Sequence, residues 1–369
     1  MNLKMKITII GCGNGAFATA ADLSAKGHQI TLYVSSEHKK NFEEIKKDNI
    51  INCTGLGPCG SVKIHCITCN IEEAMQDYDL IISVTPSYAQ EEIAAQLTPY
   101  IKDGDKILLS PGGTGGALVF AKIFYDLKPN LKVKIAEIHT LPYTARKVNS
   151  NTVNISLLTN IMYFAAFPAF YNNEMFELTK KLYPTIVLVE DVLECSMNNG
   201  NATTHPAPVV LNAGKIEYYG KHYHYKEGIT PAVGRIVQMI DDERKLICRA
   251  FGYKEVDIKE RLAMMGYTPY ADTVYECIQG SEEIFLPLEG PNDLNGRYLT
   301  EDAPLSLLAM ASIGYAAEVK TPLMDSVINL AGALKNENYW QSGRTLKKMG
   351  LENMNVKEIK AFLKYGYVK

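Results

Sequence analysis

The sequence predicts an α/β protein in which a parallel sheet with helices on both faces is followed by an all-α domain. Over residues 1–190, short runs rich in β-branched residues alternate with helix-like runs, as in parallel sheets whose connections are helices. After about residue 191, these runs give way to patterns with a helical period. The chain of 369 residues is long enough for two domains. We therefore expect a first domain over 1–190 and a second, helical domain over 191–369, with a cleft between them.

The expected elements follow from short apolar runs separated by small or polar residues. In the first domain, strands are expected at 5–11, 28–35, 79–86, 106–113, 133–140, 152–158 and 185–191, and a helix rich in small residues at 14–27. In the second domain, apolar residues at helical spacing predict helices at 230–252, 303–319 and 321–334.

The composition is that of an ordinary soluble protein. The net charge is −3 and the basic residues are spread along the chain, which argues against a nucleic-acid footprint. The best membrane candidate, residues 161–170, contains a proline and is shorter than the roughly 18–20 apolar residues of a membrane span. The N-terminus lacks the pattern of a signal peptide. We expect a cytoplasmic protein without nucleic-acid or membrane partners, and a homodimer is compatible with the sequence.

The eight cysteines are expected to be free thiols in a reducing compartment. Cys66 and Cys69 form a Cys-x-x-Cys pair and, with Cys53 and Cys59, suggest a zinc site. However, residues 62–69 alternate like a strand, so Cys66 and Cys69 would point to opposite faces. Cys53 and Cys59 are also irregularly spaced. We therefore predict no metal site.

A glycine-rich stretch, "GCGNGAFATA", follows the first expected strand and opens the first expected helix. Its glycines would allow a tight turn and a close approach of the backbone to a pyrophosphate, and a small residue three positions later would let helix and strand pack. The N–H groups at the helix start would then face the phosphates. This context is the one that a dinucleotide-binding Rossmann motif requires. The loop residues expected at the cofactor are Gly11, Gly13, Asn14, Gly15 and Ala16.

The end of the second expected strand predicts which dinucleotide is bound. NAD-binding folds place Asp or Glu there to hold the ribose 2′-hydroxyl, whereas this chain has Ser35, followed by Ser36 and Lys39. Hydroxyls and a cation suit a 2′-phosphate, although Glu37 in the same stretch argues the other way. The sequence therefore favours NADP(H), and NAD(H) stays open.

Two further strand ends are expected at the cofactor, because loops beyond the carboxyl ends of such strands border the nucleotide. The stretch "VTPS" places Thr85, Pro86 and Ser87 there. The glycines of "SPGGTGG", residues 110–116, are expected to bring backbone close to the nicotinamide. A loop without a cofactor contact is the alternative for 110–116.

The segment "NNGNATTHPAPVVLNAG" holds a candidate acid–base residue, His205. A residue before proline is disfavoured in the helical region, so we expect His205 on extended backbone facing the cleft. Reduction of a C=O or C=N bond needs a proton donor, and histidine suits that task near neutral pH. A loop histidine without chemistry is the alternative.

Possible partners of this histidine lie in "GRYLTEDAP", residues 296–304. A carboxylate that orients the imidazole would strengthen its acid–base role, and Asp302 is the candidate. Asp302 also stands where a helix N-cap is expected, so capping is its alternative role. Arg297 offers a planar fork for a substrate carboxylate, with a surface ion pair as its alternative.

The order and spacing of these motifs resemble the octopine/nopaline (opine) dehydrogenase family over nearly the whole chain. The matching stretches are "GCGNGAFA", "VTPS", "SPGGTGGAL", "AEIHTLPYTARK", "NNGNATTHPAPVVLNAGKIE", "EGITPAVGRIVQMIDDER" and "RYLTEDAPLSLLAMASIGYAAEVKTPLMD". The first is generic to dinucleotide folds, whereas the histidine–proline segment, "TLPY" and R-x-x-x-E-D-x-P are more specific.

The resemblance implies a Rossmann domain, a helical domain and a reversible, NAD(P)H-dependent joining of an amino acid, through its amine, to a 2-keto acid such as pyruvate. It implies that His205 is the catalytic histidine, that Asp302 pairs with it, and that Arg297 grips a substrate carboxylate. The further residues expected at the substrate are Thr114, Glu137, Thr140 and Asn201.

Two rival functions stay open on the sequence. A 2-keto acid reductase of the 2-dehydropantoate or glycerol-3-phosphate type would look to a catalytic lysine, but the corresponding motif has His205 instead. A nucleotide-binding regulator without turnover is the other rival, and the set of His205, Asp302 and Arg297 argues against it.

Overall fold

The computed structural model describes residues 4–35, 43 and 45–367, which form two compact units. The first, here called the Rossmann unit, comprises Met1–Gly112 and Ile123–Leu188, and the second, the helical unit, comprises Gly113–Lys122 and Val189–Lys369. The change of unit at residue 189 lies close to the expected boundary after residue 190. Residues 113–122, expected in the first domain, instead cluster with the helical unit, because their backbone is hydrogen-bonded to side chains of that unit.

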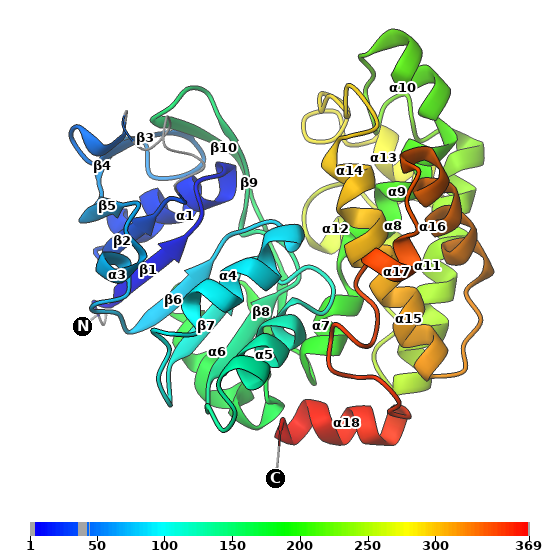
Figure 1. The fold of residues 1–369 in the computed structure, drawn as a ribbon. Coiled ribbons are helices and arrows are strands. Elements are labelled where there is room, and N and C mark those ends of the chain that lie inside the picture. Colours follow the sequence, from blue (N-terminus) through cyan, green and yellow to red (C-terminus); the bar gives the residue numbers. More distant parts are fainter. Residues whose placement is uncertain (1–3, 36–42, 44, 368–369) are drawn as a thin grey trace. The chain divides into compact units, whose positions relative to one another are not determined.

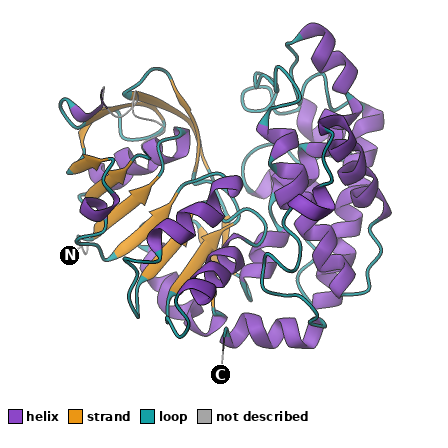
Figure 2. Ribbon diagram, viewed as in Figure 1, coloured by secondary structure: helices purple, strands orange, loops and turns teal. Residues whose placement is uncertain are grey.

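The Rossmann unit is built on a sheet in the order β12-β11-β8-β7-β6-β1-β2-β5 (Figures 1 and 2). Its strands are β1 (Lys6–Ile10), β2 (Gln29–Tyr33), β5 (Cys66–Thr68), β6 (Leu80–Ser83), β7 (Lys106–Leu109), β8 (Lys134–Ile138), β11 (Met162–Phe167) and β12 (Ile186–Leu188). All neighbours are parallel except β8 and β11. The strand order reverses at β1, which lies between β2 and β6, and nucleotides bind at the carboxyl ends of strands at such a point.

A second, four-stranded sheet that the sequence did not predict belongs to the same unit, in the order β4-β3-β10-β9. Its strands are β3 (Ile50–Gly55), β4 (Gly60–Lys63), β9 (Tyr143–Lys147) and β10 (Thr152–Leu158), of which only β10 was expected. Helix α1 (Asn14–Ala25) contacts strands of both sheets. This explains its small residues, because a helix that is packed on several sides must be apolar around most of its circumference.

The remaining helices of this part of the chain connect the strands. They are α3 (Ile71–Ala74), η2 (Ser87–Ala89), α4 (Gln90–Leu97), α5 (Gly116–Leu127), η3 (Ala169–Tyr171) and α6 (Asn172–Lys180), with α5 running across the boundary between the units. The buried core of the Rossmann unit is largely aliphatic and includes the β1 side chains Ile7 and Ile9.

One expectation for this unit was wrong, and one apolar segment forms a strand that the sequence did not predict. Residues 62–69 do not form one strand, because the chain passes from β4 in one sheet to β5 in the other, and the backbone between them bonds to Asn49 through Ile64. Residues 161–170 were considered only as a membrane segment, but they contain β11, whose residues are all buried because it lies between β8 and β12. Within the described residues, no helix is long and apolar enough to cross a membrane.

The helical unit confirms the predicted all-α second domain (Figure 2). Its helices after residue 189 are α7 (Val192–Met197), α8 (Gly200–Thr204), α9 (Pro206–Leu211), α10 (Ala213–Tyr219), α11 (Pro231–Phe251), α12 (Ile258–Met264), α13 (Val274–Gln279), α14 (Arg297–Thr300), η4 (Ala303–Leu307), α15 (Leu308–Ala316), α16 (Pro322–Lys335), α17 (Tyr339–Ser342) and α18 (Val356–Tyr365). The expected helix at 303–319 begins with the π-helical turn η4.

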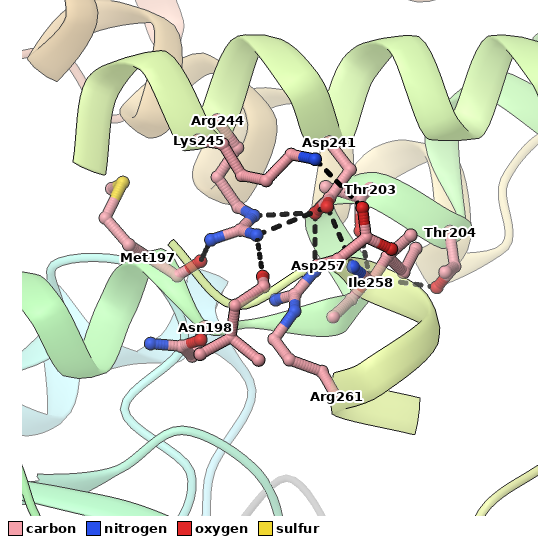
Figure 3. A network of polar contacts seen from close by, with 12 residues as sticks. Met197, Asn198, Thr203, Thr204, Asp241, Arg244, Lys245, Asp257, Ile258 and Arg261 are labelled. Atoms are coloured by element: carbon pink, nitrogen blue, oxygen red, sulfur yellow. Dashed lines mark hydrogen bonds and ion pairs between the residues drawn. The ribbon is translucent and has the colours of Figure 1, made fainter. Parts of the chain in front are cut away.

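A buried charge network holds part of the helical unit together (Figure 3). Asp241 on α11 accepts from Arg244 Nε at 2.6 Å and from Arg261 Nη2 of α12 at 2.7 Å. Its other oxygen accepts from the backbone N–H of Ile258 at 2.9 Å. Burial by itself raises the pKa of Asp241, but the charges of Arg244 and Arg261 outweigh burial, so the pKa lies below its ordinary value. Asp241 is therefore ionised at neutral pH and links the two helices.

Candidate active site

His205 lies at the junction of α8 and α9, in helical and not extended backbone (φ −103°, ψ −57°). The expected extended conformation was wrong. The His205 N–H donates to the Asn201 carbonyl at 3.1 Å, and the Val209 N–H donates to the His205 carbonyl at 3.2 Å. Pro206, which lacks a donor, occupies the first position of α9, where none is needed. Helical bonds on both sides thus outweigh the penalty on a residue before proline.

Both nitrogens of the His205 ring have partners. Nδ1 lies 2.8 Å from Oδ2 of Asp302, and Nε2 lies 2.9 Å from the hydroxyl of Tyr225. His205 and Asp302 are 4% and 7% exposed, so water does not screen their interaction. Among the described residues, the Asp302 side chain makes no capping bond to η4. The carboxyl group therefore pairs with the histidine, as expected, and does not act as the N-cap.

Aromatic rings fix the orientation of the imidazole. Tyr298 stacks on it with a centroid distance of 3.6 Å and an interplanar angle of 10°, and His224 meets it edge-on at 5.5 Å. The residues expected from the sequence did not include His224, Tyr225 and Tyr298. The spacing of four residues between Tyr298 and Asp302 was a usable signal for Tyr298, since such residues share a helix face. No spacing rule connects residues 224 and 225 to the histidine.

Burial disfavours charge on both members of the pair. Burial lowers the pKa of His205 to about 3, with a further decrease from Arg297 and an opposing effect of Glu301. Burial raises the pKa of Asp302 well above its ordinary value, with Glu301 raising it further. Both shifts favour an uncharged imidazole beside a protonated carboxyl group that donates to Nδ1. In this form Nδ1 accepts, and Nε2 carries the single ring N–H hydrogen and donates it to the Tyr225 hydroxyl.

Arg297 forms an ion pair through Nε with Glu301, one helical turn away. The ion-pair alternative from the sequence is therefore present, but it does not bury the arginine. The Arg297 side chain is 62% exposed, whereas that of Glu301 is only 6% exposed. Glu301 thus binds one edge of the Arg297 guanidinium group, which faces solvent. A planar guanidinium group in this position can bind a substrate carboxylate.

The other expected substrate residues are divided between the two units. In the helical unit, the hydroxyl of buried Thr114 accepts from Asn199 Nδ2 at 3.2 Å, and its carbonyl accepts from Arg344 Nη1 at 2.8 Å. Asn201 is exposed on α8. In the Rossmann unit, Glu137 is fully buried on β8 and Thr140 is half-buried just after that strand.

The glycine loop has the geometry of a phosphate site. Gly11 has φ +136°, and a Cβ there would lie 2.5 Å from the Val84 carbonyl oxygen, so only glycine fits. Gly13 precedes α1 without a side-chain cap, and a Cβ on it would meet no described atom within 4 Å. Uncapped N–H groups facing open space fit a pyrophosphate. Asn14 uses its side-chain oxygen to accept the Lys147 N–H at 2.8 Å, and Ala16 is fully buried.

The remaining expected cofactor residues follow strand ends near this loop. Thr85 shares a hydrogen bond of 2.9 Å with the Ser83 hydroxyl, Pro86 opens η2, and Ser87 is buried. Ser35 is half-buried and follows β2. Ser36 and Lys39 lie outside the described residues. For the described cysteines, no disulfide forms, and the described residues contain no group of three or more potential metal ligands.

Comparison with known proteins identifies the family. A model of the alpha-helical domain of NAD/NADP octopine/nopaline dehydrogenase matches residues 188–335. An opine dehydrogenase of Arthrobacter sp. (strain 1C) is 34% identical over 96% of this chain and 97% of its own length. The chain belongs to the opine dehydrogenase family. A vitopine synthase of Allorhizobium ampelinum is 25% identical over 95% of this chain and 96% of its own.

Solved structures support the same fold. An octopine dehydrogenase solved with NADH and L-arginine has a TM-score of 0.79 at 19% identity and 99% coverage of both chains. A yersinopine dehydrogenase with bound NADP+ has a TM-score of 0.74 at 16% identity, also with 99% coverage of both. Members of the opine dehydrogenase family are NAD(P)-dependent oxidoreductases that act on CH–NH groups, and this chain is such an enzyme, joining an amino acid reductively to a 2-keto acid.

The glycerol-3-phosphate dehydrogenase rival is not favoured. The model of its NAD-dependent N-terminus matches only residues 6–115, and a glycerol-3-phosphate dehydrogenase of Colwellia psychrerythraea is 27% identical over 31% of this chain. This similarity therefore covers dinucleotide binding and leaves out the segment with His205, which the octopine/nopaline model includes.

Proposed function

We propose that His205 is the general acid–base group of a reversible, NADP(H)-dependent opine dehydrogenase, that Asp302 is its proton partner, and that Arg297 binds a substrate carboxylate. The observation that carries this proposal is the buried 2.8 Å contact between His205 Nδ1 and Asp302 Oδ2. A histidine held by a carboxyl group in a water-poor site is a standard arrangement for moving protons. Arg297 lies five residues before Asp302, so one short stretch of chain supplies both the proton partner and the anion binder.

In the proposed mechanism, the amine of the amino acid adds to the keto carbon, and loss of water gives an imine. Arg297 holds a substrate carboxylate in a bidentate pair. The acid–base pair protonates the departing oxygen and keeps the imine nitrogen protonated, which makes the carbon electrophilic. A bound nicotinamide supplies the hydride that this carbon accepts. In the reverse direction, the same pair accepts the proton from the secondary amine.

We propose a preference for NADP(H) over NAD(H). Ser35 follows β2 at the position where an acid would hold a ribose 2′-hydroxyl, and the sequence supplies Ser36 and Lys39 close by. Comparison of kcat/KM for NADPH and NADH tests this proposal. A Ser35→Asp variant is expected to move the preference toward NADH, because a carboxylate repels the 2′-phosphate. A wild-type enzyme that strongly prefers NADH would contradict it.

We propose that residues 1–190 bind the cofactor and that residues 191–369 carry the acid–base pair. We also propose that Glu137, Thr140, Thr114 and Asn201 contact the amino acid substrate, and that the enzyme works in the cytoplasm. Similar proteins are named vitopine synthase and tauropine dehydrogenase, so their names differ in the opine concerned. The amino acid panel used in an assay must therefore be broad.

The deciding experiment measures NADPH and NADH oxidation at pH 7 with a panel of 2-keto acids, alone and together with each of a panel of amino acids and other amines. Oxidation that requires both partners is expected, and it would name the substrates. Oxidation with a keto acid alone would instead indicate a simple ketoreductase. Tight cofactor binding without oxidation in any combination would favour a regulator without turnover.

A further inference from the structure

The hydroxyl of Tyr225 lies directly at the nitrogen through which His205 would exchange protons. Because Nδ1 of His205 contacts Asp302, Nε2 is the nitrogen left for a substrate, and Nε2 is 2.9 Å from the Tyr225 oxygen. Tyr225 is 5% exposed. A nitrogen of an imidazole ring makes one strong hydrogen bond. A substrate must therefore either displace this hydroxyl or exchange its proton through it.

Displacement of the Tyr225 hydroxyl is disfavoured because packing and hydrogen bonds hold this residue in place. Its ring stacks on Phe285 with a centroid distance of 4.2 Å and an interplanar angle of 13°. The surrounding segment, residues 221–228, is tied to its neighbours by hydrogen bonds from Gly290 N to the His222 carbonyl (2.8 Å) and from Asn212 Nδ2 to the Gly228 carbonyl (3.0 Å). Moving the hydroxyl aside would disrupt an aromatic stack in a buried, close-packed site.

The imidazole is equally unable to turn its Nε2 toward another point. Tyr298 stacks on its ring, and Asp302 holds Nδ1. His224 packs edge-on against His205, and its own Nε2 donates to the Thr204 carbonyl at 3.0 Å. Asp302, His205 and Tyr225 therefore form a fixed, linear series of proton-carrying groups.

We propose that Tyr225 is the catalytic residue that passes the proton to the substrate, with His205 and Asp302 as the proton source behind it. This proposal rests on the proposed function and refines its acid–base step. The Tyr225 O–H proton moves to the substrate oxygen or nitrogen as the proton on His205 Nε2 moves to the Tyr225 oxygen. The Asp302 O–H proton moves to Nδ1, so the phenol is restored, the imidazole stays neutral with its hydrogen now on Nδ1, and a carboxylate remains. After product release, a proton from water enters at the Tyr225 oxygen as the Tyr225 proton passes back to Nε2 and the Nδ1 proton returns to Asp302, which restores the starting state without rotation of the ring. The reverse reaction runs the same steps backward.

The electrostatics agree with this order of transfer. Burial raises the pKa of Tyr225 well above its ordinary value, and the neighbouring Tyr298 and Asp302 raise it further. The residue therefore stays a phenol and does not accumulate as phenolate. As the Tyr225 proton leaves for the substrate, the N–H group of His205 supplies a second proton to the Tyr225 oxygen. A relay of this kind moves more than one proton in a single step.

The first test is Tyr225→Phe, which removes the hydroxyl and keeps the ring stack on Phe285. Because one acid–base group is worth about 10²–10⁴-fold, and water can replace it in part, kcat is expected to fall at least about tenfold. KM for the keto acid should change little, since Arg297 is untouched. Tyr219→Phe, at a 68% exposed tyrosine on α10, is the matched control and should retain wild-type kcat.

The second test is a proton inventory, the dependence of kcat on the fraction of D2O at a pH where the rate is constant. Wild-type enzyme is expected to give a curved plot, because several protons move together, and Tyr225→Phe a straighter one. Replacement of Tyr225 by 3-fluorotyrosine keeps the shape and makes the phenol more acidic. The 3-fluorotyrosine enzyme should therefore show a shifted pH profile of kcat. This measurement still tests the proposal if the Tyr225→Phe variant folds poorly.

The outcomes separate this proposal from the proposed function. If Tyr225→Phe turns over as fast as wild type or faster while His205→Ala is impaired, the hydroxyl is only a placeholder that substrate displaces, and the relay is wrong. A straight wild-type inventory, or an unchanged pH profile with 3-fluorotyrosine, would also overturn the relay. If His205→Ala is unimpaired, the acid–base assignment itself fails and the relay fails with it.

Discussion

Two buried aspartates in the helical unit behave in opposite ways. Asp241 and Asp302 are 0% and 7% exposed, so both lose most of their hydration. Asp241 is bound by Arg244 and Arg261, and its pKa lies below the ordinary value. Asp302 contacts one imidazole, and its pKa lies well above the ordinary value. The residue type and the burial are shared, and the difference lies in the number of positive partners.

One helical unit thus uses the same type of side chain in two ways. Asp241 is a structural ion, and Asp302 is proposed to carry a proton. Two guanidiniums supply enough Coulomb energy to offset desolvation, and arginine does not give up its proton. The carboxylate between them therefore stays ionised and cannot take part in proton exchange. An imidazole is itself uncharged when desolvated, so it does not offset the desolvation of Asp302, and the pKa of this carboxyl group stays raised. Groups with pKa values perturbed in this way are typical of catalytic sites.

The largest expected effect is the loss of stability in Asp241→Asn. Removal of the negative partner leaves two buried guanidiniums without their counter-charge, which is expected to cost about 3–5 kcal/mol of the free energy of unfolding. Urea denaturation measures this change. The matched control is Asp242→Asn on the adjacent, solvent-exposed position, where a change of about 0–1 kcal/mol is expected. Equal losses in both variants would contradict the assignment of Asp241 as a structural ion.

The next effect is on turnover in His205→Ala. Loss of the acid–base group is expected to lower kcat at least about 100-fold, while NADPH binding, followed by fluorescence titration, persists because no cofactor residue is altered. His65→Ala changes an exposed histidine and should turn over like wild type. Unchanged turnover in His205→Ala would exclude the acid–base role.

Asp302→Asn is the direct counterpart of Asp241→Asn. We expect kcat to fall at least about tenfold, because an amide cannot carry the proton that Asp302 supplies to Nδ1. We expect the free energy of unfolding to change by less than about 1 kcal/mol, because the residue has no arginine-bound charge to lose. The capping interpretation predicts the opposite pattern, a loss of about 0.5–2 kcal/mol with turnover kept.

The last expected effect is on the pH dependence of stability. Burial lowers the pKa of both His205 and His224 to about 3, whereas the unfolded chain protonates histidine near pH 6.5. Because each histidine binds its proton only in the unfolded state over this range, its contribution makes stability fall as the pH decreases from about 6.5 toward 3, by up to about 1.4 kcal/mol per pH unit. The raised pKa of Asp302 acts in the opposite direction above about pH 4, because there the folded state holds a proton that the unfolded state lacks. The lowered pKa of Asp241 acts in a lower window, adding stability above about pH 4 that is lost as the pH falls further.

His224→Gln isolates one of these histidines, and urea denaturation at pH 7, 6 and 5 measures the effect. The variant is expected to lose less stability between pH 7 and 5 than wild type, because one fewer unfolded-state proton is bound. A pH dependence equal to that of the wild type would mean that His224 is not held neutral in the folded state.

The sequence by itself determined the features that depend on near neighbours. The glycine spacing after an apolar run predicts the turn at Gly11, and the alternation of β-branched and helix-like runs predicts the Rossmann sheet and the all-α domain. The order of motifs along the chain also identified the family. These signals are readable because backbone geometry and local periodicity are set within a few residues.

Tertiary structure decided which of several local possibilities is realised. Asp302 satisfies the sequence rule for an N-cap equally well, and only its distance to His205 shows that it pairs with the imidazole. His205 is helical although proline follows it, because hydrogen bonds from both flanking turns outweigh the local preference. The protonation behaviour of Asp241 and Asp302, and the contact of Tyr225 with Nε2, depend on residues distant in sequence. Burial and long-range charge determine these properties, and no local pattern encodes them.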